Sequence, residues 1–176
     1  MNELKTLVNW HIKEKFYDIC LKVDGQLIWA PKKVLTTKSL FFNNLFALLP
    51  TLTEFTIRDT SFQAMQSTIH FLCSDEEVDF NDGQNFVAMY RLSMRYGIPD
   101  LSATLSLRLM SNLTMENALA TLVLATEEKD VQLAIKVVGF AKRYGRADEL
   151  LNAYSMLEYL KKNPSLASVV MNRLQR

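Results

Sequence analysis

The dipeptide Asp24-Gly25 constrains the fold of this chain more than any other feature of the sequence. Both residues tolerate positive φ angles, and an Asp-Gly pair between alternating apolar segments is the strongest short-range signal for a β-hairpin. The flanking segments, 19–23 and 26–30, are short and apolar, so we expect two antiparallel strands. A helical pattern begins beyond Pro31. Because this stretch contains no catalytic motif, it favours a protein that works by presenting surfaces.

Alternation assigns each hairpin side chain to one of two faces, since successive strand residues point in opposite directions. The expected inner face consists of Ile19, Leu21, Val23, Ile28 and Ala30. Leu27 and Trp29 then lie on the outer face. Tryptophan is enriched at binding hot spots, so Trp29 is a candidate interface anchor. The alternative is that an N-terminal helix or a dimer partner covers it.

The first residues, 2–15, have the pattern of an amphipathic helix rather than that of a signal peptide. Leu4, Leu7 and Ile12 belong to its apolar stripe. Trp10 lies off this stripe and gives the helix apolar material on a second side. We therefore expect this helix to pack against more than its own chain.

The remaining pattern predicts an α+β unit followed by helices alone. We expect a helix at 40–48, a short strand from Glu54, and a capping box in which Thr60 begins the next helix. Gly97 should end a later helix in the left-handed conformation, and Thr114 should cap the first helix of an antiparallel helical extension. The predicted domains are therefore 1–111 and 112–176.

The composition excludes several classes of partner. The chain has 20 basic and 19 acidic residues, so no basic surplus supports nucleic-acid binding. No apolar segment is long enough to cross a membrane. Two cysteines, Cys20 and Cys73, cannot form a disulfide framework or a zinc site by themselves, and without an export signal we expect an intracellular protein with reduced thiols.

Catalytic and metal-binding residues are not expected. His11 and His70 have no second ligand at metal-binding spacing, and the sequence lacks a glycine-rich phosphate loop, a nucleophile elbow and a carboxylate pair. The acidic segment 75–82 lacks the glycine and final glutamate of a calcium loop, so we interpret it as a solvated loop. We expect no cofactor, no metal and no enzyme activity.

The order of these motifs resembles that of a BTB/POZ domain. The residues that carry the resemblance are Asp18, Gly25, Ile28, Ala30, Lys32, Leu35, Ser39, Phe42 and Phe46. The segments 62–80 and 86–101 are similar to later helices of the family, including Tyr96-Gly97-Ile98-Pro99-Asp100-Leu101. From Asn112 onward the chain resembles the BACK-like helical tail of speckle-type POZ proteins.

This resemblance implies a homodimer that acts as a substrate adaptor of a cullin-RING ubiquitin ligase, with the cullin scaffold and a substrate or other partner protein as further partners. The implied dimer interface consists of Leu4, Leu7, Trp10 and Asp18. The implied cullin-binding residues are Phe46, Leu52, Glu54 and Tyr90.

The sequence departs from the family pattern at informative positions. Pro31 replaces the family's histidine, and the apolar-x-Glu signature expected after the Phe46 helix falls near Pro50-Thr51-Leu52, where there is no glutamate. Leu52-Thr53-Glu54 has the required residue types at a later position. The alternative function is therefore a BTB dimerisation scaffold, or a competitor that does not bind a cullin; an enzyme is a third and disfavoured alternative.

Overall fold

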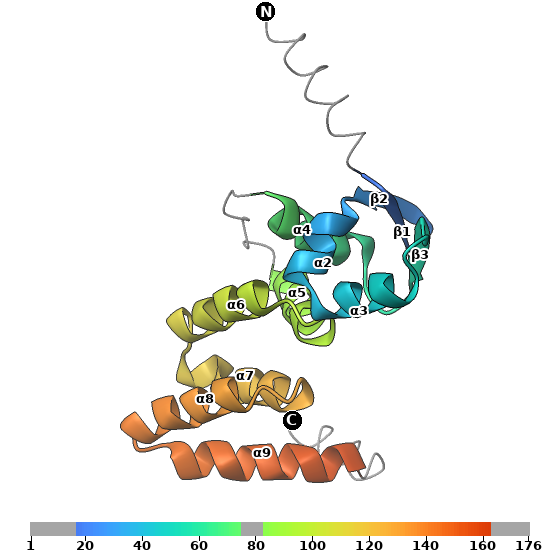
Figure 1. The fold of residues 1–176 in the computed structure, drawn as a ribbon. Helices are drawn as coiled ribbons and strands as arrows, with labels where there is room; N and C mark the ends of the chain where they lie inside the picture. Colours follow the sequence, from blue (N-terminus) through green and yellow to red (C-terminus); the bar gives the residue numbers. More distant parts are fainter. Residues whose placement is uncertain (1–16, 75–82, 163–176) are drawn as a thin grey trace, which may run out of the picture. The chain divides into compact units, whose positions relative to one another are not determined.

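The computed structural model describes residues 17–74 and 83–162. The chain divides between Leu105 and Ser106 into two compact units, and each is described by itself (Figure 1). The domain boundary that we predicted after Ser111 stays a prediction. The predicted N-terminal helix and the predicted acidic loop lie outside the described residues.

The first unit combines three strands with helices. In chain order its elements are β1 (Ile19–Val23), β2 (Gln26–Ala30), α2 (Lys32–Lys38), α3 (Leu40–Leu48), β3 (Glu54–Ile57), α4 (Phe62–Cys73) and α5 (Gly83–Arg95), followed by α6 (Pro99–Ser111), which continues into the second unit. The sheet order is β2-β1-β3, with β1 antiparallel to β2 and parallel to β3.

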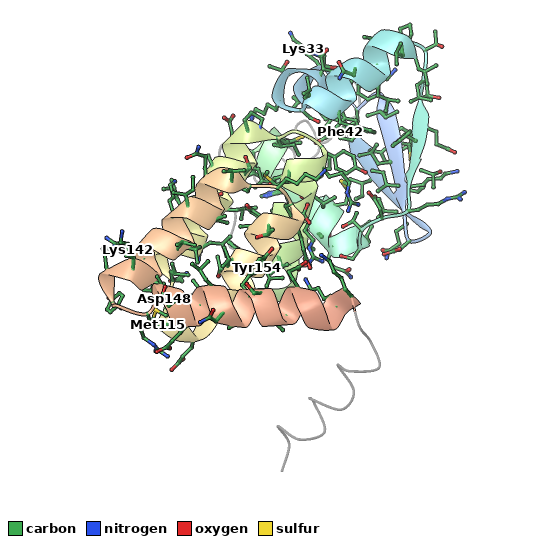
Figure 2. All side chains as sticks on the ribbon, turned by 90° about the horizontal axis from the view of Figure 1, so that it is seen from below. Lys33, Phe42, Met115, Lys142, Asp148 and Tyr154 are labelled. Atoms are coloured by element: carbon green, nitrogen blue, oxygen red, sulfur yellow. The ribbon has the colours of Figure 1, made fainter. Side chains whose placement is uncertain are left out.

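The hairpin forms as the sequence predicts. Asp24 and Gly25 have φ angles of 48° and 74°, as a two-residue hairpin turn with positive φ at both positions requires. The predicted inner-face residues are all at most 8% exposed, whereas Leu27 and Trp29 are 53% and 54% exposed. In both overall views the helices of this unit lie on one side of the sheet (Figures 1 and 2). The other face therefore carries the exposed apolar side chains.

Helix α4 begins one residue later than the sequence predicts. Ser61, and not Thr60, is its N-cap, because the Ser61 hydroxyl accepts a hydrogen bond from the Ala64 N–H at 3.3 Å. The Phe62 N–H donates to the Asp24 carboxylate at 3.1 Å, across 38 residues of chain. This contact from the hairpin turn satisfies the first N–H of the helix at Phe62. The prediction of Thr60 as the cap is wrong because a contact distant in sequence supports the later start.

The start of α3 meets the end of α5, and each helix satisfies polar groups of the other. The N–H of Leu40 donates to the Gly97 carbonyl at 2.9 Å, and the Ser39 hydroxyl donates to the Tyr96 carbonyl at 2.7 Å. The same Ser39 oxygen accepts from the Phe42 N–H at 3.3 Å. The start of a helix leaves N–H groups without partners, and the end of a helix leaves carbonyl groups without partners. At this junction, groups at the start of α3 donate hydrogen bonds to carbonyls at the end of α5.

Aromatic rings pack around this junction. Tyr96 lies with its ring centroid 4.7 Å from that of Phe41 and 5.5 Å from that of Phe42, and Phe42 stacks on Phe46 at 5.8 Å. Phe42, labelled in Figure 2, is only 1% exposed. Offset and edge-on ring pairs at these separations stabilise a core beyond the area they bury. Through Phe46, the C-terminal end of α3 packs against this aromatic core.

Gly97 permits the close approach of the two helices. Its φ of 58° is left-handed, and the hydrogen bonds from Ile98 N–H to Ser93 O (2.8 Å) and from Gly97 N–H to Met94 O (3.3 Å) form a Schellman cap. A Cβ atom at this position would lie 2.9 Å from the Cβ of Leu40. The predicted left-handed cap is confirmed, and the residue must be glycine for two independent reasons.

The second unit contains α7 (Met115–Glu127), α8 (Val131–Arg143) and α9 (Ala147–Lys162), which contact one another. The predicted cap at Thr114 is confirmed, since its hydroxyl and the Asn117 side chain form a reciprocal capping box. Gly145 ends α8 with a φ of 67°. The buried core residues of this unit include Ala118, Leu122, Ala125, Leu133, Val137, Ala141 and Leu150.

Gly97→Ala and Gly145→Ala form a matched pair that separates backbone strain from steric contact. Both positions are left-handed, but no atom lies within 4 Å of a Cβ built at Gly145. We expect Gly145→Ala to lower the free energy of unfolding by about 1 kcal/mol, and Gly97→Ala by about 2–5 kcal/mol. Chemical denaturation followed by circular dichroism measures both. Equal losses would show that the Leu40 contact has no energetic effect.

Candidate protein-interaction surfaces

An exposed apolar surface lies at the C-terminal end of α3. We call it the α3 tip and define it as Leu48, Leu49, Pro50 and Leu52. Leu48 and Leu49 are 80% and 50% exposed. Exposed leucines side by side at a helix end are candidates for burial against another protein.

The α3 tip is held in a fixed position. Its turn is closed by a hydrogen bond from Leu52 N–H to Leu49 O at 3.2 Å. The Lys32 ammonium donates to the Pro50 carbonyl at 3.2 Å and lies 5.6 Å from the centroid of the Phe46 ring. Lys32 therefore ties α2 to the far end of α3. A surface fixed in this way loses little conformational entropy when a partner binds.

The residues that the resemblance assigned to cullin binding occupy different environments. Phe46 is 8% exposed and lies in the aromatic core beneath the α3 tip, and Tyr90 on α5 is 0% exposed. Leu52 is half-buried, and Glu54 is exposed and forms an ion pair with Lys22 at 2.6 Å. In this conformation Leu52 and Glu54 offer surface to a partner, whereas Tyr90 supports the helices from inside. All four assignments stay predictions.

Sequence analysis missed Leu48 and Leu49 as surface residues. The signal was available, because Leu40, Asn44 and Leu48 follow one another at intervals of four and therefore share a helix face. This face lies away from Phe42 and Phe46, and Leu40 is 63% exposed.

Of the predicted dimer residues, Leu4, Leu7 and Trp10 lie outside the described residues. Asp18 is described, and its carboxylate accepts a hydrogen bond from the Lys32 N–H at 2.6 Å. The N-cap of α2 is Pro31, which has no side-chain acceptor, so Asp18 supplies the missing cap from β1's N-terminal side. This local role stands beside the predicted interface role, which stays a prediction.

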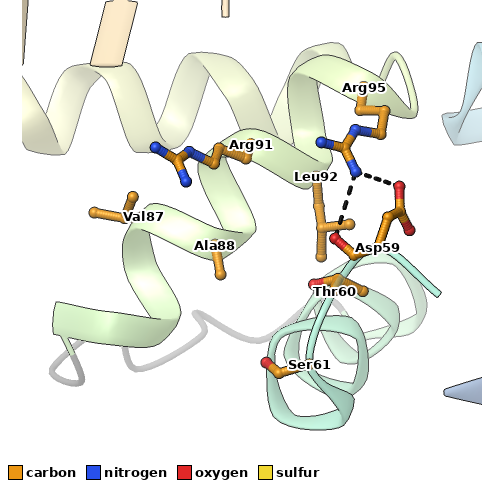
Figure 3. A pocket seen from close by; sticks show the side chains of 8 residues that line it. All are labelled: Asp59, Thr60, Ser61, Val87, Ala88, Arg91, Leu92 and Arg95. Carbon is orange, nitrogen blue, oxygen red and sulfur yellow. Dashed lines mark hydrogen bonds and ion pairs between the residues drawn. The ribbon is translucent and has the colours of Figure 1, made fainter. Parts of the chain in front are cut away.

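A pocket of about 330 Å³ lies between α5 and the connection from β3 to α4 (Figure 3). Arg95 donates to both the carboxylate and the backbone carbonyl of Asp59, as the dashed lines in Figure 3 mark. The Tyr96 hydroxyl also donates to Asp59 at 3.3 Å. Burial, and then the neighbouring Asp59 charge, raise the pKa of Tyr96 above its usual value. The pocket residues are Asp59, Thr60, Ser61, Val87, Ala88, Arg91, Leu92 and Arg95.

Polar groups of this pocket have structural partners. Its carboxylate is engaged by Arg95 and Tyr96, and the Ser61 hydroxyl caps α4. Elsewhere, burial raises the pKa of the Cys73 thiol despite the nearby Lys38, which is the opposite of what activates a nucleophilic cysteine. Among residues 17–74 and 83–162, no group of three His, Cys, Asp or Glu side chains could hold a metal ion.

A membrane-spanning helix is also absent from the part of the chain that the structure describes. The described residues do expose apolar side chains, among them those of the α3 tip and of the outer face of the hairpin. These features define a class of protein that acts by binding other proteins.

The chain belongs to the BTB/POZ family, since the model of the BTB/POZ domain matches residues 9–113, which is more than half of the sequence. The predicted α+β BTB fold with a helical extension is thereby confirmed. Among solved structures, the chain is similar to the BTB (Tramtrack and Bric a brac) domain of human gigaxonin, with 19% identity and a TM-score of 0.44 over 56% of this chain and 81% of that one. The comparison with curated proteins found no match. BTB domains are protein-interaction and dimerisation modules, so the chain is a protein-interaction adaptor at this level of description.

Asp18 can be tested for its capping role with two variants. We expect Asp18→Ala to lower the free energy of unfolding by about 1 kcal/mol, because the first turn of α2 loses its acceptor. Asp18→Asn retains an acceptor oxygen and should recover most of this loss in urea titrations. If both variants are equally destabilised, the charge of Asp18 matters more than the cap.

Proposed function

We propose that this chain is a homodimeric substrate-adaptor subunit of a cullin-RING ubiquitin ligase that acts inside the cell. The observation that carries the proposal is the α3 tip, an exposed pair of leucines beside Leu52 on a member of the BTB/POZ family. The helical extension, which resembles a BACK domain, would belong to the same adaptor.

The α3 tip combines exposed apolar side chains with contacts that hold its backbone in place. Complete burial of a leucine side chain contributes about 1.5–3 kcal/mol, so Leu48 and Leu49 together could provide most of the affinity of a small contact. Leu52 extends this apolar surface. Phe46 beneath it and the Lys32 hydrogen bond to Pro50 keep it in place.

A second function is favoured by the surroundings of Glu54. The loop after α3 has no glutamate before this residue, and Glu54 itself is engaged by Lys22. A cullin that required a free carboxylate here would have to break that ion pair. The alternative is a BTB dimerisation scaffold, or a competitor that occupies partners without recruiting a cullin.

Cullin binding can be tested with Leu48→Asp and Leu52→Asp. We expect the wild-type protein to bind a purified cullin scaffold at micromolar concentration and each variant to bind about 10- to 100-fold more weakly, as loss of one buried leucine predicts. Isothermal calorimetry measures the affinities. Leu48→Asp is the cleaner probe because Leu48 is 80% exposed and its replacement leaves the core intact.

Leu107→Asp on α6 is the matched control, since Leu107 is 67% exposed and lies outside the α3 tip. It should bind like the wild-type protein. If the wild-type protein does not bind the cullin, the scaffold or competitor function takes the place of the adaptor function.

Dimerisation can be tested at the first-helix seam, which we define as Leu4, Leu7 and Trp10. We expect Leu7→Glu combined with Trp10→Glu to convert the dimer into a soluble monomer, because two charges would be buried at the contact. Light scattering coupled to size-exclusion chromatography gives the molar mass. An unchanged dimer mass would place the family dimer interface elsewhere.

A further inference from the structure

Strand β2 is an open edge of the sheet. The order β2-β1-β3 leaves one side of β2 without a neighbouring strand among the described residues. On this strand the residues Leu27 and Trp29 are also 53% and 54% exposed to solvent. A sheet edge exposes backbone donors and acceptors that can pair with a further strand.

The register determines which residues of β2 direct their backbone groups outward. A two-residue turn makes Val23 and Gln26 a hydrogen-bonded pair, and such pairs then alternate with non-hydrogen-bonded pairs. Leu27 opposite Lys22 and Trp29 opposite Cys20 are therefore non-hydrogen-bonded pairs.

The position of Cys20 supports this assignment independently. Its N–H donates to the Thr53 carbonyl at 2.9 Å, on the β3 side, and therefore points away from β2. Trp29, its partner across the strand pair, directs its own N–H and carbonyl away from β1, and Leu27 does the same. Within the described part of the chain these groups have no hydrogen-bond partner. The two residues with exposed apolar side chains are thus also the two with outward backbone groups.

The edge lacks the features that usually prevent pairing. Natural edge strands are protected by charged side chains, by proline within the strand or by β-bulges. Strand β2 has the sequence Gln-Leu-Ile-Trp-Ala, which is uncharged, and Pro31 comes only after its last residue. Two such strands can approach each other without charge repulsion.

We propose that the β2 edge pairs with the β2 edge of a second copy of this chain, around a two-fold axis at Ile28. Ile28 is the central residue of the five-residue strand, so antiparallel pairing about it leaves no overhang. Leu27 then lies opposite Trp29 of the second copy, and the reverse contact follows by symmetry. Each pair exchanges two backbone hydrogen bonds, and each places a leucine beside a tryptophan on the outer face.

The size of this contact limits its strength. Stable interfaces bury more than about 1,000 Å² in total, and a five-residue edge with two apolar side chains per copy provides less. The pairing is therefore weak and depends on concentration. It does not use the first-helix seam, so it would join dimers into larger assemblies or associate monomers if the seam is absent.

Leu27→Pro and Trp29→Lys test the pairing without breaking the hairpin. Proline at Leu27 removes an N–H that points away from β1 and also the exposed leucine side chain, so the hydrogen bonds to β1 stay. Lysine at the exposed Trp29 places like charges across the two-fold axis. Light scattering over a concentration series should show a mass that rises with concentration for the wild-type protein. For both variants the mass should stay constant. The series is repeated in the Leu7→Glu, Trp10→Glu background, where association through β2 alone remains.

Amide hydrogen exchange followed by NMR gives a second readout. The Leu27 and Trp29 amides should be protected only at high concentration, whereas the Ile28 amide, which bonds to β1, should be protected at every concentration. Leu107→Lys, an apolar-to-charged change at a residue that is 67% exposed on α6, should behave like the wild-type protein.

Three results would overturn the proposal. One is a wild-type mass that does not rise with concentration, and another is a Trp29→Lys mass that rises as the wild-type mass does. The third is protection of the Leu27 and Trp29 amides that is independent of concentration, which would mean that another segment of the same chain covers the edge. The first-helix seam is tested separately by the Leu7→Glu, Trp10→Glu masses, so its failure can be distinguished from failure of the β2 pairing.

Discussion

The contact between the start of α3 and the end of α5 is the constraint on which the first unit depends. Two helix ends that would each leave polar groups without partners are brought together, so that the Leu40 N–H and the Gly97 carbonyl satisfy one another. Ser39 belongs to both sides, because its hydroxyl accepts from α3 and donates to the Tyr96 carbonyl. The aromatic core then fixes the direction in which α3 leaves this junction. The position of the α3 tip is therefore determined at the opposite end of the same helix.

The α3 tip and the outer face of the hairpin have a common origin. The inner faces of the sheet and of α3 are buried, since Ile28 and Phe42 are directed into the core. In a strand the residues beside a core residue point to the opposite face of the sheet, and in a helix the residue two positions away lies on the opposite side. Where those positions hold Trp29 and Leu48 instead of charged residues, the scaffold presents apolar side chains to solvent. A single exposed apolar side chain is ordinary on a protein surface, whereas adjacent ones such as Leu48 and Leu49 are candidates for a binding site.

Sequence patterns predict the local structure of this chain well and its long-range contacts poorly. The hairpin at Asp24-Gly25 and the cap at Gly97 were predictable, because positive φ angles restrict the residues that can occupy them. The start of α4 was not predictable, since Thr60 and Ser61 are both good caps and a contact from another part of the chain supports Ser61. The surface role of Leu48 could have been inferred from helical spacing. The role of Asp18 as a cap could not, because its partner is 14 residues away.

The hydrogen bond between the hairpin turn and α4 has a consequence for the order in which the chain folds. Asp24 can accept from the Phe62 N–H only where the hairpin turn lies beside the start of α4, and these two residues are 38 positions apart in the chain. We expect a contact across so long a loop to form together with the rest of the unit, because loop closure is entropically unfavourable until other contacts support it. The first N–H of α4 is satisfied by a residue of the hairpin turn. We therefore expect the first turn of α4 to become stable only when the whole unit has folded.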